Sequence, residues 1–291
     1  MISMNIRPKC VPCLLNRALY ETALVDSSKS MKVIQEACKI IGRYDLKDSC
    51  SAIVASEVHK ATYDILGTAD PYKTIKNRCN QTARSLLPKA EKLIGESEDK
   101  LRAAILCSII GNVLDFGIPS SPESPEQLSE HFDTILSEGL GVDDSDKIRA
   151  YLEKGEKVLY FADNCGEIVF DRLLCKEIKK FDVHLIFVAR GEPILTDATI
   201  NDVREFGLDE VADEVLTTGC FAVGVDFDKM GEDLREALKC ADLIVSKGMA
   251  NYETFSETDY RPIAHLLRTK CEPVARDMSL KTDINVAMVY E

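Results

Sequence analysis

Acidic and amide side chains follow two of the apolar runs in the second half of the chain. Asp163 and Asn164 come directly after the run KVLYFA, and Asp197 follows the run VHLIFVA, about one strand-helix-strand unit later. Neighbouring strands would bring these three side chains to one point. Oxygen donors without a histidine or thiolate among them suit a hard or borderline divalent ion such as Mg²⁺ or Mn²⁺. An acid that ends a buried strand is better explained by such a site than by solvation.

The same residues also have a purely structural interpretation. Asn164 and Glu167 have the spacing of a helix capping box, and acids such as Glu167 and Asp171 are favoured near a helix start. Asn164 would then be the N-cap, and the free amides after it would be available to an anion. Glu167 is expected to cap the helix or to bind a metal water, and Asp171 to contact the N-terminal half. Asp197 has the same alternative, as the N-cap of the next helix.

A third strand exit supplies a cation. Lys247 follows the apolar run LIVS, with Gly248 after it and Asn251 in the next segment. A lysine at this position can hold a phosphate as a point charge, and a glycine permits close approach of the backbone. A lysine that snorkels to the surface is the alternative. Because two other polar strand exits accompany it, we favour a functional role for Lys247.

The first half of the chain offers further polar groups for such a pocket. Asn112 and Asp115 lie three residues apart, on one helical face, immediately before a proline-rich stretch. They could complete the pocket, and a buried helix cap is the alternative. Tyr72, Lys76 and Asn80 recur every four residues and could contact a sugar or a base, although a solvated helix face is the favoured interpretation.

The chain contains two regions with different patterns of apolar residues, and the elements of these regions must position the residues named above. From Pro8 to about Tyr151 apolar residues recur every three or four positions, which predicts a helical bundle. After about Glu156 short β-rich runs alternate with helical stretches, which predicts a mostly parallel sheet with helices on its faces. Ligands of such sheets bind beyond the carboxyl ends of the strands. We therefore divide the chain into a helical region, residues 1–150, and an α/β catalytic region, residues 151–291.

Charge and composition exclude several classes of protein. The formal charge of −13 repels nucleic acid and anionic membranes, so neither is an expected partner. No apolar stretch is long enough to span a membrane, and the start of the chain lacks the apolar core of a secretory signal. These features predict a soluble cytoplasmic protein, and nothing in them indicates an oligomeric state.

The cysteines point to the same compartment. Eleven are scattered through the chain, an odd number that fits poorly with a closed disulfide framework. Cys10 and Cys13 form a single CxxC pair, which alone is a weak zinc signal. With Cys38, Cys50 or Cys79 the pair could complete a four-thiolate site, but packed, reduced thiols are the expected state.

Several stretches taken in order resemble a known family. ADNCGEIVFD, RGEPILTDAT, SKGMANYE and TKCEPVA are similar to the C-terminal signatures of the family long called domain of unknown function 89, now described as damage-control metal-dependent phosphatases. RPKCVPCLLNRA, DPYKTIKNRCN and IIGNVLDFGI match the N-terminal half. The resemblance spans Lys9 to about Ala275, and the CxxC pair resembles the prokaryotic branch.

The resemblance implies both a fold and a metal site. The fold is a helical N-terminal region packed on a Rossmann-like, three-layer α/β/α domain with a divalent metal in the cleft. The family's metal ligands fall on Asp163, Asn164 and Asp197, and its KG-motif lysine falls on Lys247. Relatives often have asparagine where this chain has Thr196.

The function that these features predict is metal-dependent hydrolysis of small phosphorylated metabolites such as sugar phosphates, nucleotides or damaged phosphometabolites. The ion, Mg²⁺, Mn²⁺, Co²⁺ or Ni²⁺, would bind a phosphoryl oxygen and lower the pKa of a bound water. Direct attack by Asp163 is ranked second, since Cys165 stands where the haloacid dehalogenases carry their second acid. The expected catalytic residues are Asp163, Lys247 and Glu167. The expected substrate contacts are Arg190, Asn251, Asn112, Asp115 and Gly248.

Two other functions remain open on the sequence. An S-adenosylmethionine-dependent carboxyl methyltransferase is one, although no glycine-rich loop follows the first strand of the α/β half. A protein that binds a phosphorylated nucleotide without turnover is the other, although such an anion sensor would rather use arginine than carboxylates.

Overall fold

The computed structural model describes residues 4–112, 125–256 and 258–291. In these parts of the chain a seven-stranded sheet has the order β1-β7-β6-β5-β2-β3-β4. Every described pairing is parallel except that of β6 with β7. The strands are β1 Val142–Asp143, β2 Lys157–Phe161, β3 His184–Ala189, β4 Glu214–Thr217, β5 Leu243–Lys247, β6 Ile263–Arg268 and β7 Asn285–Tyr290. The predicted α/β fold with a mostly parallel sheet is confirmed.

The sheet is covered on both faces, as parallel sheets require. Side chains of β2 alternate between two apolar cores. Val158 and Tyr160 face a core that includes side chains of α5 (Lys100–Gly111) and α8 (Ile168–Ile178). Leu159 and Phe161 face a smaller core that includes side chains of α10 (Glu232–Lys239) and α11 (Gly248–Phe255). This alternation gives the predicted three layers of helix, sheet and helix.

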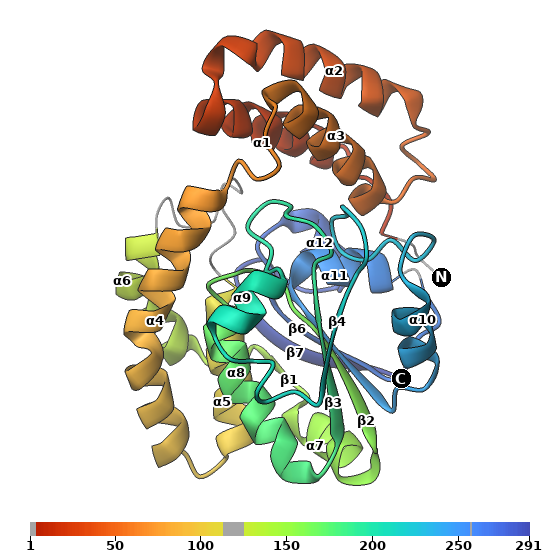
Figure 1. Ribbon diagram of the computed structural model, residues 1–291. Coiled ribbons are helices and arrows are strands. Elements are labelled where there is room, and N and C mark those ends of the chain that lie inside the picture. The colour runs from red at the N-terminus through yellow and green to blue at the C-terminus, as the bar shows by residue number, and fades with distance from the viewer. Residues whose placement is uncertain (1–3, 113–124, 257) are drawn as a thin grey trace.

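Helices fill the N-terminal region, as predicted. α1 (Cys10–Val25), α2 (Ser30–Arg43) and α3 (Ser51–Leu66) pack on one another around their own apolar cluster. They lie together at one end of the molecule, next to the loops that leave the sheet (Figure 1). The remaining helices are α4 Lys73–Glu96, α6 Pro125–Glu138, α7 Ser145–Lys154, α9 Ile200–Glu205, α10 Glu232–Lys239, α11 Gly248–Phe255 and α12 Glu272–Asp277.

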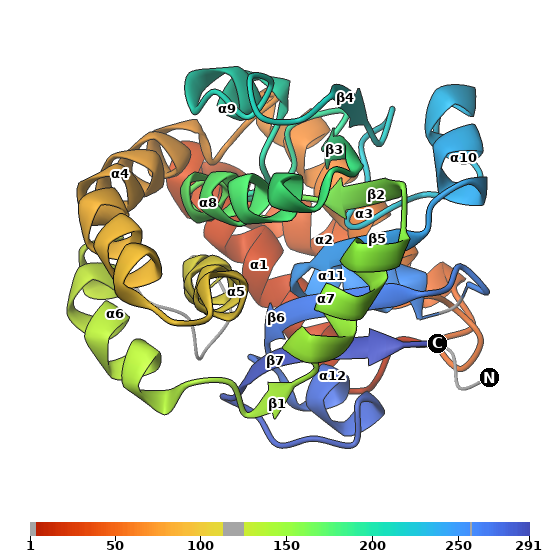
Figure 2. The same cartoon turned by 90° about the horizontal axis from the view of Figure 1, so that it is seen from below.

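α4, α5 and α6 gather at one side of the sheet (Figure 2). Their apolar side chains share a single core with the α/β region: Ile105 and Ile110 of α5 belong to the same cluster as Phe170 and Leu174 of α8. Gly111 makes this packing possible at the end of α5, because a Cβ there would lie 2.9 Å from the Cα of Glu167. The end of α5 is therefore held against the start of α8.

None of the helices in the described parts of the chain is long and apolar enough to cross a membrane. Asp115 and the first part of the predicted proline-rich loop lie outside the described residues.

Candidate active site

Three neighbouring strands end at one edge of the sheet, and each is followed by a predicted site residue. β2 pairs with β3 on one side and with β5 on the other, so the residues after these strands lie side by side. The backbone of Asp163 accepts the amide of Ala198 at 2.7 Å, and Asn164 forms an isolated bridge with Asp197. The structure thus brings together the three residues of the expected ligand set.

The carboxylate of Asp163 is almost fully enclosed, with 5% of the residue exposed. Its Oδ2 accepts hydrogen bonds from the side-chain amides of Asn112 at 2.7 Å and Asn164 at 2.9 Å. Burial raises the pKa of Asp163 well above its usual range, and the negative charges of Asp197 and Glu167 raise it further. The positive charges of Arg190 and Lys270 act in the opposite direction and do not offset these effects.

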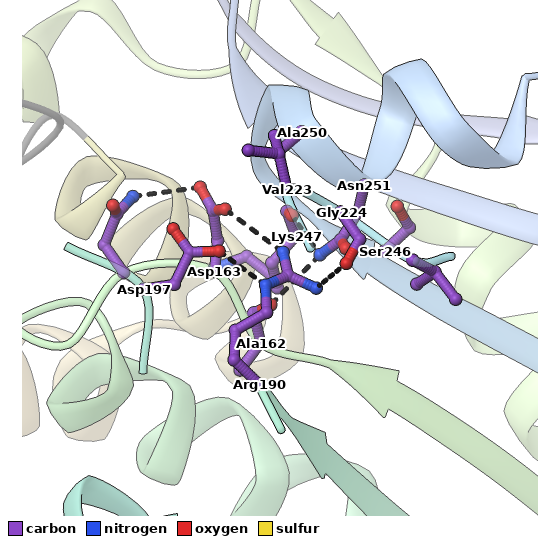
Figure 3. Close-up of polar contacts among 12 residues, drawn as sticks. Ala162, Asp163, Arg190, Asp197, Val223, Gly224, Ser246, Lys247, Ala250 and Asn251 are labelled. Atoms are coloured by element: carbon purple, nitrogen blue, oxygen red, sulfur yellow. Dashed lines mark hydrogen bonds and ion pairs between the residues drawn. The ribbon is translucent and has the colours of Figure 1, made fainter. Parts of the chain in front are cut away.

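The guanidinium of Arg190 faces both buried aspartates (Figure 3). Its Nε donates to Asp197 Oδ2 at 2.5 Å, and its Nη1 donates to the carbonyl of Gly224 at 2.7 Å. Nη2 lies 3.8 Å from Asp163 Oδ1 and makes no hydrogen bond within the described residues. The guanidinium therefore keeps its Nη2 amino group available beside Asp163.

Asn164 is fixed from both sides. The hydroxyl of Thr196 donates to Asn164 Oδ1 at 2.7 Å, while the Asn164 amide nitrogen donates to Asp163. Thr196 thus orients the expected amide ligand.

The predicted N-cap role of Asn164 is wrong, since α8 begins only at Ile168 and Glu167 precedes it. The segment after β2 instead continues to pair with the loop after β3, where the Cys165 amide donates to the carbonyl of Thr196 at 2.8 Å. The Asn164 amide donates to Glu167 Oε2 at 3.3 Å, which is one half of the expected capping box.

Lys247 is fully buried and forms ion pairs with two acidic side chains. Its ammonium pairs with Glu167 Oε1, donates to Asp171 Oδ1 at 2.8 Å and also donates to Ser108 of α5. Burial lowers the pKa of Lys247, but the charges of Asp171 and Glu167 outweigh it and leave a raised pKa. The three donors of the ammonium are used in this arrangement, so direct contact of Lys247 with phosphate stays a prediction.

Asp171 joins the helical region to this network, as expected. Its Oδ1 accepts from the hydroxyls of Ser108 at 2.7 Å and Tyr160 at 2.8 Å. Burial raises the pKa of Asp171 to about 6, although Lys247 acts in the opposite direction.

Gly248 and Asn251 shape the other wall of the site. Gly248 has φ of 74°, and a Cβ on it would fall 1.9 Å from Asp163 Oδ2. The Asn251 amide donates to the carbonyls of Ala162 at 3.0 Å and Lys247 at 2.8 Å, which ties the ends of β2 and β5 together. Asn251 Oδ1 is buried and accepts no hydrogen bond from the described residues.

Sequence reasoning missed one cation of the site. Lys270, almost fully buried, donates to the carbonyl of Asn112, and its positive charge lowers the pKa of Asp163. Asn112 follows the last residue of α5 and donates to Glu167 Oε2 at 3.0 Å as well as to Asp163. The signal for Lys270 was present in the sequence, because it follows β6 much as Lys247 ends β5.

The stripe on α4 is buried, so the favoured solvated-face interpretation is wrong. The Tyr72 hydroxyl donates to Glu21 Oε1 at 3.3 Å, and Asn80 donates to Asp202 at 3.1 Å. Lys76 pairs with Asp70 at 3.2 Å. The stripe therefore ties α4 to α1 and α9.

All eleven cysteines are free thiols, as expected. Within the described part of the chain, no three histidine, cysteine, aspartate or glutamate side chains are arranged to hold a metal. Cys10 and Cys13 therefore belong to no such group among the residues that the structure describes. The expected ligand set of two carboxylates and one amide, Asp163, Asp197 and Asn164, is not a group of this kind.

Known proteins resemble this chain over nearly its whole length. The model of the damage-control phosphatase ARMT1-like domain matches residues 6–286. A damage-control phosphatase of Archaeoglobus fulgidus is 42% identical over 99% of this chain and 100% of its own length. A damage-control phosphatase of Pyrococcus horikoshii is 31% identical, and the match covers 98% of each chain. The crystal structure of a DUF89 family protein from Pyrococcus horikoshii superposes with a TM-score of 0.88 at 29% identity over 99% of both chains.

Proposed function

The chain belongs to the damage-control phosphatase ARMT1-like family, and from this membership we propose that it is a metal-dependent phosphatase of small phosphorylated metabolites. The single observation that carries the metal part of the proposal is the balance of buried charge. The described groups at the strand ends comprise four carboxylates and three cations: Asp163, Glu167, Asp171 and Asp197 against Arg190, Lys247 and Lys270. Burial raises the pKa of Asp163, and the negative charges of Asp197 and Glu167 raise it further; a divalent cation would offset this negative charge.

The residues present fit such an ion. Asp163, Asn164 and Asp197 supply two carboxylates and an amide from adjoining segments, a set of oxygen donors that suits Mg²⁺, Mn²⁺, Co²⁺ or Ni²⁺. When bound there, the ion supplies polarisation of the phosphoryl group and activation of water for the attack.

Arg190 is the side chain that is proposed to bind the phosphoryl group of the substrate. Its Nη2 is the guanidinium nitrogen that makes no hydrogen bond within the described residues, and it lies beside Asp163. Arginine donors form strong, charge-assisted hydrogen bonds to phosphoryl oxygens. We assign Arg190 to hold the substrate's phosphoryl group against the expected metal ligands. Asn251 Oδ1 is available to accept a hydrogen bond from the substrate or from a water.

Glu167 is the proposed proton acceptor, and Lys247 is proposed to position it. Lys247 engages Glu167 Oε1, whereas Oε2 lies on the side of Asn112 and Asn164, the two amides that also contact Asp163. A carboxylate held in this way can take the proton of an attacking water. Lys247 thus contributes by fixing the orientation of Glu167.

A substrate and metal screen tests the proposal. Chelator-treated protein is incubated with p-nitrophenyl phosphate, sugar phosphates and nucleotides, with Mg²⁺, Mn²⁺, Co²⁺ or Ni²⁺ added back, beside a methyl-transfer assay with S-adenosylmethionine. Metal-restored phosphate release by the wild type, absent from Asp163→Ala, is the expected result. If the rate of phosphate release is the same with and without the chelator, and the same in Asp163→Ala as in the wild type, the proposed metal site is wrong. Methyl transfer without phosphate release favours the methyltransferase instead.

A further inference from the structure

The loop between β4 and α10 contacts both the backbone around Arg190 and its side chain. At the start of the loop the Thr218 amide donates to the carbonyl of Ala189 at 2.9 Å, and the Thr218 hydroxyl accepts the amide of Gly191 at 3.0 Å. Farther along, the carbonyl of Gly224 accepts from Arg190 Nη1 at 2.7 Å (Figure 3). The conformation of this loop therefore determines where the guanidinium lies.

Gly224 is packed closely against α11. Its φ of 67° lies in the left-handed region that favours glycine. A Cβ at this position would lie 2.5 Å from the carbonyl oxygen of Ala250 and 2.7 Å from Thr254 Cγ2. The backbone of the loop thus lies directly on the helix that begins at the end of β5.

Two hydroxyl groups hold the backbone on either side of Gly224. The Val225 amide donates to Thr254 Oγ1 of α11 at 3.3 Å, and the Val223 amide donates to Ser56 Oγ of α3 at 2.8 Å. The first of these bonds has a direct geometric consequence. The N–H of Val225 and the carbonyl of Gly224 belong to one planar peptide group and point in opposite directions. Because Thr254 holds the N–H, it also fixes the direction of the carbonyl.

The direction of this carbonyl decides how the guanidinium of Arg190 is oriented. The guanidinium is planar, and its Nε donates to Asp197 while its Nη1 donates to Gly224. Two bonds at different nitrogens fix the plane, whereas the bond at Nε alone would let it turn. The Nη2 amino group beside Asp163 is therefore aimed by the peptide group of Gly224.

We propose that Thr254 is a positioning residue that fixes the guanidinium of Arg190 through the peptide group between Gly224 and Val225. This inference rests on the proposed phosphatase function, in which Arg190 binds the phosphoryl group. Without the Thr254 hydroxyl, the peptide group loses the acceptor that holds its N–H. The arginine then binds phosphate from a less well defined orientation, which weakens the interaction.

Thr254→Val tests the assignment, because it replaces the hydroxyl by a methyl group of similar size. Binding of inorganic phosphate to the metal-loaded protein is measured by isothermal titration calorimetry, and KM is measured with p-nitrophenyl phosphate. Both the Kd and the KM should rise at least about fivefold, and Thr254→Ser, which keeps the hydroxyl, should stay within about twofold of the wild type. Thr62→Val is the matched control, since the Thr62 hydroxyl donates to the carbonyl of Val58 within α3, and it should also stay within about twofold.

A double-mutant cycle with Arg190→Met separates positioning from a general structural effect. If Thr254 acts through the guanidinium, adding Thr254→Val to Arg190→Met should change the Kd for phosphate by less than about twofold. An equal loss with and without the arginine overturns the assignment, as do an unchanged Kd and KM in Thr254→Val. In both cases a wild type that releases phosphate leaves the proposed phosphatase standing. Absence of phosphate release from every ester by the metal-loaded wild type overturns the proposed phosphatase, and this inference with it.

Discussion

Gly248 leaves no room for a side chain beside Asp163: a Cβ at position 248 would lie 1.9 Å from Asp163 Oδ2 and 2.9 Å from Asn112 Nδ2. The first residue of α11 and the second residue after β2 thus occupy adjoining space at the strand ends. The backbone of Gly248, with φ of 74°, forms the wall against which the Asp163 carboxylate rests.

Gly248→Ala is expected to displace the Asp163 carboxylate and to reduce phosphate release by at least about a hundredfold, since small displacements of catalytic groups are costly. Gly67→Ala is the matched control, because Gly67 has nearly the same φ, 75°, but open space around the added Cβ. Both variants should lose about 1 kcal/mol of stability from backbone strain. Equal activity of the two variants would show that the close approach to Asp163 is unimportant.

Asp163→Ala should abolish metal binding, measured by isothermal titration calorimetry on chelator-treated protein, and should reduce phosphate release at least about a hundredfold. The free energy of unfolding should not fall, because the raised pKa of Asp163 shows that its buried charge is unfavourable in the folded protein. Metal affinity equal to that of the wild type would remove Asp163 from the ligand set.

Lys247→Met should destabilise the protein by about 3–5 kcal/mol, because Glu167 and Asp171 would then be buried without their cation. Urea unfolding measures the loss. Adding Glu167→Gln and Asp171→Asn to the variant should recover most of it, since the uncompensated charges are then removed as well. Lys147→Met, at an exposed ion pair with Asp144, should leave stability unchanged. Unchanged stability in Lys247→Met, with only a raised KM, would instead support direct contact with phosphate.

His265 predicts a pH dependence of stability. Burial lowers the pKa of this histidine to about 3 in the folded protein, against 6.5 ordinarily, and Arg261 contributes to the shift. Below pH 6.5 the unfolded chain therefore takes up a proton that folded His265 does not, so its contribution to stability is present above pH 6.5 and is lost as the pH falls toward 3. The slope from this group approaches about 1.4 kcal/mol per pH unit.

Urea unfolding at pH 7, 6, 5 and 4 of the wild type and of His265→Phe checks this effect. The aromatic ring of the variant retains the packing against Tyr252 and Tyr290. The free energy of unfolding of His265→Phe should fall less steeply toward low pH than that of the wild type. Two curves of equal slope would show that His265 is not buried as a neutral ring.

The architecture was largely predictable because it depends on local patterns. Short β-rich runs between helical stretches predict a mostly parallel sheet, and strand exits then predict where polar groups meet. Asp163, Asn164 and Asp197 follow from this rule alone. The order of the strands does not, and neither does the antiparallel entry of β7 between β6 and β1, since both depend on how distant segments pack.

The environment of Lys247 shows what local patterns leave out. Its position after an apolar run suggests a free cation, whereas the structure surrounds it with Glu167, Asp171 and Ser108. Ser108 lies 139 residues away in the sequence, on a helix of the other half of the chain. The wrong N-cap prediction for Asn164 has the same origin, because its backbone pairs with the distant Asp197 rather than starting a helix.

The shared core of α5 and α8 limits how the protein can be recombined. A boundary near residue 150 separates the helical sequence pattern from the alternating strand and helix pattern. Dividing the protein there would expose the face of α8 that packs on Ile105 and Ile110. It would also strip Ser108 from Lys247 and Asn112 from Asp163. In chimeras between relatives, the segment from α4 to the last strand should therefore be kept together as one unit. The helices α1–α3 have their own apolar cluster and can be taken from the other relative.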